Sequence, residues 1–483
     1  MLRASQSALA LSLLWLLAAL ITGGTAWTPA FLASASAWLL LFLKSNRKPW
    51  EKHPAAFCAL SALAAYLSTF RWHGGDDITN SLFPIEVLKY HTLQMNDVIS
   101  PWLDGKSHDF IVDVGPHRLS FHPIFTGILA IPFYIIPVLF KAPITETFLH
   151  NMSKLSASCL VTLSVIVFYR AAAARASKGW ALATTLIYAF GTFSFSISSQ
   201  ALFQHGATQL GAALIFWGLA TNKDWSGFIA GLGCGVALAA RGDSVFFAVA
   251  AGLYVLWRKP KTLFRFILGA AGPIALIGSY WLYYTGKFAE PGTANQLSGF
   301  GPFQTEAFFA LLASPTRGLI FFCPAAFFGL AAAFSKEKDE RALGVCFILA
   351  CLGYWFFVSH FRAWTAGMTF GPRYFAMLAT VLLLLSAGVE DWVRRKHLLA
   401  VWAAAGAFSI VTHALGAYLT WPGSFNLGIQ EATAWQFSLH PLLNTLRPDG
   451  ALGKLPLFAR VVVLAGLLFF ARALAKTLRR VVY

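Results

Sequence analysis

The sequence predicts an all-α polytopic membrane protein, and three observations lead to this fold class. Of its 483 residues, 57% are hydrophobic and only 12% are charged, about half the charged fraction of soluble domains. The mean hydropathy is +0.63. Apolar runs of roughly 17 to 25 residues recur along the chain, and each is long enough to cross a hydrocarbon core about 30 Å thick.

The basic residues set the expected topology. The net charge is +17, yet Lys and Arg lie in short clusters between apolar runs, as in the cytoplasmic loops of membrane proteins. This distribution argues against a nucleic-acid partner. The clusters lie at 44–53, 170–178, 258–265, 336–341 and 393–397.

With these clusters inside, about 14 helices cross the membrane. Residues 1–26 also fit a cleavable signal peptide, but we favour a first span because the next segment is itself a membrane helix. Spans are expected near 7–23, 27–44, 54–71, 155–170, 179–197, 207–221, 226–240, 243–257, 264–284, 316–334, 342–359, 373–388, 397–419 and 455–476.

The chain divides into three parts on this scheme. Residues 1–53 hold two spans and a cytoplasmic loop, 54–390 form a transmembrane core, and 391–483 hold the last spans. Two long polar loops, 72–120 and 420–454, are expected on the outer side.

Two further helices are expected not to cross the membrane. The apolar stretch 121–140 is interrupted by three prolines, and a crossing there would place the basic cluster 170–178 outside. We therefore expect a re-entrant or interfacial helix, which is tolerated where protein buries it. Another interfacial helix is expected over 81–91, capped by Asn80 or Ser81 and lying flat at the membrane surface.

Two adjacent carboxylates, Asp76 and Asp77, stand where the third apolar segment ends. Gly74 and Gly75 let the backbone turn sharply out of that span. A carboxylate at such a junction is partly desolvated, which raises its basicity and suits it to removing a proton. A solvated pair of loop charges is the alternative.

Positive side chains and imidazoles are expected at the same outer face. A carboxylate at the membrane boundary suits transfer of a sugar from a lipid phosphate, because such a donor is confined to the membrane surface. The phosphate that leaves in this reaction needs positive charge to stabilise it. For any one arginine, the alternative is an anchor that snorkels to the interface. The candidates are Arg241, Arg317, Arg362, Arg373, His117, His122 and His205.

Five segments resemble the GT-C class of membrane glycosyltransferases, which use polyprenyl- or dolichyl-phosphate-linked sugars. The stretch GDDITNSLFPIEVLKYHTLQMNDV (75–98) is similar to their acidic pair and following interfacial helix. FHPIFTGILAIP (121–132) resembles the His-Pro-Pro-Leu segment of protein O-mannosyltransferases and the Lys-Pro-Pro-Leu segment of the lipid A aminoarabinose transferase, with Ile124 in place of the second proline. Bacterial members also have segments that look like QALFQHG (200–206), SPTRGLIFFCP (314–324) and FGPRYFAMLA (370–379).

The resemblance implies a GT-C-like bundle with its catalytic core in 54–390 and an inverting sugar transfer at the outer face of the cytoplasmic membrane. Asp76 corresponds to the base that activates the acceptor, and Asp77 supports it or helps to bind a metal. His122 is expected to face the donor phosphate or the acidic pair. The other expected substrate contacts are Arg241 and Arg373, then Arg317, His205 and His117.

The implied partners are a polyprenyl-phosphate-linked sugar donor, a lipid or cell-surface glycan acceptor, and membrane lipids. A divalent cation, Mg or Mn, stays open as a cofactor, and no metal ligands are assigned.

Three other functions are alternatives to a glycosyltransferase. A transporter or flippase for lipid-linked sugars places ionisable residues mid-membrane and has paired halves with broken helices. A glycan ligase or polymerase uses similar donors but lacks an acidic pair at the start of the first loop. A structural membrane subunit is the remaining alternative. The gathering of charged candidates at the outer face favours the glycosyltransferase.

Overall fold

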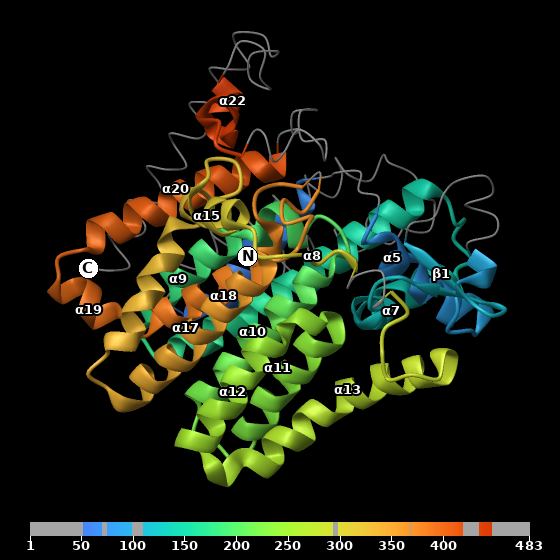
Figure 1. Cartoon of the computed structure of the whole chain (residues 1–483), viewed down its shortest axis with the longest axis horizontal. Coiled ribbons are helices and arrows are strands. Elements are labelled where there is room, and N and C mark those ends of the chain that lie inside the picture. The colour runs from blue at the N-terminus through green and yellow to red at the C-terminus, as the bar shows by residue number, and fades with distance from the viewer. Residues whose placement is uncertain are drawn as a thin grey trace.

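The computed structural model describes residues 52–69, 75–98, 110–292, 298–367, 369–418 and 434–446. These residues form a helical bundle with one two-stranded antiparallel hairpin among them (Figure 1). The spans expected at 7–23, 27–44 and 455–476 lie outside the described residues, as does most of the loop 420–454.

The spans expected between 54 and 419 coincide with helices, apart from one that is broken. The stretch 316–334 holds only the short α16 (Leu319–Phe322) and a 3₁₀ helix, η5 (Pro324–Phe334). Pro324 lacks a backbone N–H, so α16 cannot continue through it. The longer helices are α4 (Pro54–Leu67), α8 (Glu146–Ala173), α9 (Lys178–Phe190), α10 (Gln204–Ala220), α11 (Ser226–Ala240), α12 (Val245–Arg258), α13 (Leu263–Thr285), α17 (Lys338–Val358), α18 (Ala376–Ala387) and α20 (Leu399–Tyr418).

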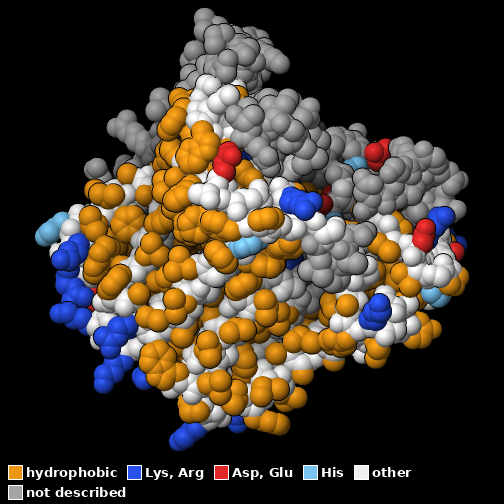
Figure 2. All heavy atoms as spheres, viewed as in Figure 1, with side chains coloured by type: hydrophobic (Ala, Val, Ile, Leu, Met, Phe, Trp, Pro, Cys, Tyr) orange, Lys and Arg blue, Asp and Glu red, His pale blue; other side chains and the backbone are white. Residues whose placement is uncertain are grey.

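The bundle has an apolar exterior, as expected of a protein embedded in lipid. By length and composition, four helices in the described part can cross a membrane: α8, α13 together with the preceding turn, α17 and α20. Helix α13 exposes large side chains along its length, including Phe264 and Tyr283. Figure 2 shows hydrophobic side chains covering much of the visible surface of the bundle.

Basic and acidic side chains join several helix ends at one end of the bundle, which we call the basic end. Nε of Arg258, at the end of α12, donates to Asp339 in the first turn of α17 at 2.6 Å. Nε of Arg175, just after α8, donates to Glu340 at 2.7 Å, and Lys259 donates to the Leu219 carbonyl near the end of α10. Lys and Arg side chains gather along the lower left margin of the view in Figure 2.

Helix α11 packs closely against α13 through glycines spaced four residues apart. A Cβ at Gly227 would lie 2.7 Å from the Thr262 carbonyl oxygen, and a Cβ at Gly231 would overlap the carbonyl oxygen of Phe266. Gly235 continues the same stripe against α13. Small residues at this spacing let two helix backbones approach in a membrane.

The segment after α4 folds into α5 (Ile78–Ile85), the π-helical turn η1 (Glu86–Tyr90), the strands β1 (Ile111–Val114) and β2 (His117–Ser120), and α7 (Phe125–Leu139). Strands β1 and β2 pair antiparallel from Ile111 with Ser120 to Val114 with His117. Figure 1 shows α5, β1 and α7 together at the right of the view. Helix α7 has Pro132 and Pro137 inside it and is shorter than the candidate spans, and its re-entrant placement stays a prediction.

The predicted cap and surroundings of the first loop helix were wrong. The helix begins at Ile78, so Asn80 and Ser81 lie inside it rather than at its end. The Asn80 Oδ1 atom accepts a hydrogen bond from the Gly127 N–H of α7 at 2.8 Å instead. Residues 79–85 are all buried by protein, so α5 does not present an apolar side to lipid.

We predict that Gly231→Ala destabilises the protein, because the added methyl group must push α11 and α13 apart. Overpacking of this kind costs on the order of 1–3 kcal/mol. The apparent melting temperature in detergent should fall. It should not fall for Gly272→Ala on α13, where the new Cβ would have no described atom within 4 Å apart from its own helix backbone and chain neighbours. Equal melting temperatures for the two variants would contradict the packing described.

Candidate active site

The acidic pair lies in a tight turn at the start of α5. Gly75 has φ = 126°, a value that favours glycine, so the chain can turn immediately before Asp76. The Asp76 side chain is 30% exposed, whereas Asp77 is only 2% exposed. The two adjacent carboxylates therefore have different surroundings.

Asp76 lies between two basic side chains from distant parts of the chain. Its Oδ2 atom is 2.9 Å from Nη2 of Arg373, and its Oδ1 atom is 3.6 Å from Nε2 of His122. Arg373 begins the 3₁₀ turn η6 (Arg373–Phe375) just before α18, and His122 follows strand β2. Three of the predicted site residues thus meet at one point.

Arg373 is nearly enclosed, but its hydrogen-bonding capacity is only partly used. Its side chain is 11% exposed. The rings of Phe203 and Tyr374 lie 5.7 Å and 5.8 Å from its guanidinium carbon. Its Nε atom is buried and has no hydrogen-bond partner among the described residues. An arginine has five N–H donors, so this guanidinium can bind a further anion.

The charges around Asp76 stabilise its ionised form. Burial raises the pKa of Asp76, but the positive charge of Arg373, followed by the contact with His122 and a smaller contribution from His205, outweighs burial and holds the pKa well below its usual range. Asp76 is therefore a carboxylate at neutral pH, and its basicity is low while Arg373 stays in contact with it.

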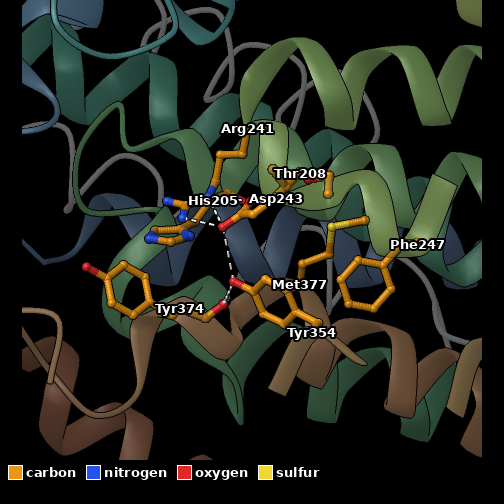
Figure 3. Close-up of a pocket in the computed structure, with 9 residues that line it drawn as sticks. His205, Thr208, Arg241, Asp243, Phe247, Tyr354, Tyr374 and Met377 are labelled. Carbon is orange, nitrogen blue, oxygen red and sulfur yellow. Dashed lines mark hydrogen bonds and ion pairs between the residues drawn. The ribbon is translucent and has the colours of Figure 1, made fainter. Parts of the chain in front are cut away.

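His205 is the second residue of α10 and lines a small polar cavity beside Tyr374 (Figure 3). It is 3% exposed, and it lies close enough to Asp76 to contribute to the lowering of the pKa of that carboxyl group. The cavity is lined by His205, Thr208, Arg241, Asp243, Ser244, Phe247, Tyr354, Tyr374 and Met377. The cavity and the acidic pair are thus neighbouring parts of one polar region.

Arg241 is occupied by Asp243, which lies two residues further along the chain. Its Nε atom is 3.1 Å and 3.2 Å from the two carboxylate oxygens of Asp243, and its Nη2 atom is 2.6 Å from one of them. The Tyr354 hydroxyl lies 3.2 Å from the same carboxylate and 2.9 Å from the Tyr374 carbonyl oxygen. Figure 3 shows Asp243 between Arg241 and Tyr354. This network holds the backbone next to Arg373.

Two other predicted residues, Arg317 and His117, contact groups outside the acidic pair. Arg317 is 1% exposed, and its guanidinium donates to the carbonyl oxygens of Thr316 and Gly367. His117 lies in the hairpin, where Nδ1 contacts Gln94 and the ring packs edge-on against Tyr284. The substrate roles of Arg317 and His117 stay predictions.

The sequence-based predictions missed Ser153, which contacts the acidic pair, and its neighbour Lys154. Ser153 of α8 lies 3.4 Å from Oδ2 of Asp77 and also accepts the Leu202 N–H. The next residue, Lys154, is buried and donates to Thr69, to Gln200 and to a backbone carbonyl. An ionisable residue inside an apolar helix is a known sign of a functional region, so Lys154 could have been noticed.

The described surroundings of Asp76 do not fit a metal site. Among the described residues, no group of three or more His, Cys, Asp or Glu side chains is placed to hold a metal ion. The Arg373 guanidinium contacts one oxygen of the Asp76 carboxylate, and its positive charge opposes a cation there.

Comparisons with known proteins find distant structural likenesses. No protein-family model matches the chain, and the search of curated proteins finds no match. One similar solved structure is the archaeal oligosaccharyltransferase AglB from Archaeoglobus fulgidus in complex with an inhibitory peptide and a dolichol-phosphate. The identity is 12% and the TM-score 0.41, over 80% of this chain and 56% of that chain.

Two further structures of the Archaeoglobus fulgidus oligosaccharyltransferase are similar. The complex with Zn and sulfate is 14% identical with a TM-score of 0.43, over 75% of this chain and 53% of that one. The form tethered to an acceptor peptide is 14% identical with a TM-score of 0.41, over 82% and 56%. This chain thus spans little more than half the length of these proteins, and likeness at this level does not assign it to a family.

Asp77 differs from Asp76 in forming no ion pair with a basic side chain among the described residues. Its Oδ1 atom is buried and has no hydrogen-bond partner among the described residues. Burial, followed by the negative charge of Asp76, raises the pKa of Asp77 to about 7. The folded protein therefore binds a proton at Asp77 at pH values where the unfolded chain has lost it.

We predict that Asp77 makes the protein less stable as pH rises from about 4 to about 7. The folded state holds the Asp77 proton over this range and the unfolded state does not, so the free energy of unfolding falls with pH. Between pH 5.5 and pH 8 the loss is about 2 kcal/mol.

Melting in detergent at these two pH values measures the effect. The variant Asp77→Asn should lack this component and should be more stable than the wild type above pH 7, because no charge is then buried. The same pH dependence in both proteins would show that Asp77 does not titrate as described.

Proposed function

We propose that the chain is a GT-C type glycosyltransferase. In this proposal it moves a sugar from a polyprenyl-phosphate-linked donor to a lipid or cell-surface glycan acceptor at the outer face of the cytoplasmic membrane. The contact between Asp76 and Arg373 carries the proposal, because it places a candidate base and a candidate phosphate ligand side by side.

The site lies at the opposite end of the bundle from the basic end. His205 is at the beginning of α10, whereas the Leu219 carbonyl near the end of the same helix binds Lys259. Arg373 lies just before α18, and the Leu384 carbonyl near the other end of α18 binds Arg175. If the basic end faces the cytoplasm, Asp76 faces the outer side, where a lipid-linked sugar donor is available.

The two side chains supply what a sugar transfer requires. As the acceptor oxygen attacks the anomeric carbon, its proton passes to the Asp76 carboxylate. The bond from that carbon to the donor phosphate breaks, and its electron pair leaves with the polyprenyl phosphate. The leaving phosphate gains negative charge, which the Arg373 guanidinium stabilises. Attack on the side opposite the phosphate inverts the anomeric configuration.

The placement of ionisable groups supports an enzyme over a transporter. A transporter is expected to carry them in the middle of its spans. Lys154 is buried in α8, but it follows Ser153, which contacts Asp77. Lys154 therefore belongs to the level of the acidic pair rather than to a separate site deeper in the bundle.

We predict that Asp76→Asn lowers sugar transfer by about 10²- to 10⁴-fold, the usual contribution of a general base. The assay uses purified protein in nanodiscs, a panel of radiolabelled polyprenyl-phosphate sugars, and membranes of the source cells as the supply of acceptor. Asp97→Asn changes an exposed carboxylate of the same loop and should transfer normally. Near-normal turnover by Asp76→Asn would refute the assignment of Asp76 as the base.

We also predict that Arg373→Ala weakens binding of a polyprenyl-phosphate sugar by about tenfold or more. Hydrogen bonds to a charged group contribute about 1.5–3 kcal/mol. Binding is measured by titrating the lipid into labelled protein in detergent. Unchanged affinity would leave Arg373 a structural partner of Asp76 and nothing more.

A further inference from the structure

Two arginine–aspartate pairs lie in the polar region, and their geometries differ. In the Arg241–Asp243 pair, both Nε and Nη2 of the arginine contact the carboxylate. In the Arg373–Asp76 pair, Nη2 contacts the carboxylate, while the buried Nε has no hydrogen-bond partner among the described residues. The Nε and Nη2 donors form one edge of each guanidinium. On this edge both donors of Arg241 are engaged by a carboxylate, whereas only one donor of Arg373 is.

An anion that fits both donors of the Arg373 edge can compete with Asp76. Phosphate oxygens match Nε and Nη2 together, which gives two charge-assisted hydrogen bonds. Asp76 has a single close contact with that edge and also has His122 as a second partner. Arg373 therefore gains hydrogen bonds if a phosphate replaces Asp76, and Asp76 keeps a partner when it is displaced.

We propose that Asp76 is an internal stand-in for the donor phosphate. In this proposal the bound phosphate takes Arg373 from Asp76, and the released carboxylate is then free to accept the acceptor's proton. The inference rests on the proposed function, because it requires a donor with a lipid phosphate.

The exchange couples donor binding to the strength of the base. While Arg373 contacts Asp76, its positive charge makes the carboxylate a poor proton acceptor. When Arg373 turns to the phosphate, that charge is shared with another anion and the basicity of Asp76 rises. Acceptors are therefore activated only when a donor is in place, which protects the site from reaction without its second substrate.

The exchange and a model in which Asp76 only positions the donor predict opposite changes in phosphate affinity when Asp76 loses its charge. If Asp76 and the phosphate compete for Arg373, removing the negative charge of Asp76 makes the phosphate bind more tightly. If Asp76 only positions the donor, the same change weakens binding or leaves it unaltered. Coupling between two sites of this kind is typically 5- to about 150-fold in affinity.

The test is the affinity of undecaprenyl phosphate without a sugar for the full chain in nanodiscs. We expect Asp76→Asn to bind this lipid on the order of tenfold more tightly than the wild type. Asp97→Asn is the matched control, because it removes a negative charge from an exposed side chain of the same loop. Its affinity should stay within about twofold of the wild type. Asp76→Ser provides a second variant if the amide fails to fold.

Each outcome decides between the alternatives. Tighter binding by the Asp76 variants alone supports the exchange at Arg373. Saturable wild-type binding that the Asp76 variants do not tighten overturns the exchange and leaves the proposed function standing. Tighter binding by Asp97→Asn to the same extent would trace the effect to the net charge of the loop rather than to Arg373, and would also overturn the exchange. Absence of saturable binding in every protein overturns both the exchange and the proposed function.

Discussion

The ion pair between Asp76 and Arg373 is the contact on which the polar region depends. It joins the start of α5 to the turn before α18, two segments almost 300 residues apart in the sequence. Arg373 is enclosed by aromatic rings, and a buried guanidinium is costly without an anion. The Tyr354 hydroxyl fixes the backbone of η6 from one side, and Ser153 contacts Asp77 from the other.

Adjacent carboxylates acquire different properties because the groups around each of them differ. The turn at Gly75 leaves Asp76 beside Arg373 and His122, where positive charge favours ionisation. It directs Asp77 into the protein, where burial favours the neutral acid. A pair that carries one negative charge rather than two repels an incoming phosphate less. This division explains why two neighbouring carboxylates can be accommodated in one small site.

The sequence predicted the helices, and the position of His122 next to the acidic pair, better than it predicted the other contacts of the site. Apolar runs and basic clusters located the helices, since these depend on local composition. The cap at Asn80 was wrong because tertiary packing decided it, through the N–H of Gly127 on another helix. The partners of Asp76 and the saturation of Arg241 by Asp243 depend on side-chain geometry, which residue order alone does not specify.

A structure of the protein with a polyprenyl-phosphate sugar bound tests the central claim most directly. The account predicts that the donor phosphate lies within hydrogen-bonding distance of both Nε and Nη2 of Arg373. It also predicts that Asp76 has moved out of contact with Arg373 and faces the anomeric carbon from the side opposite the phosphate. A headgroup bound elsewhere, with the contact between Asp76 and Arg373 intact, would contradict the account.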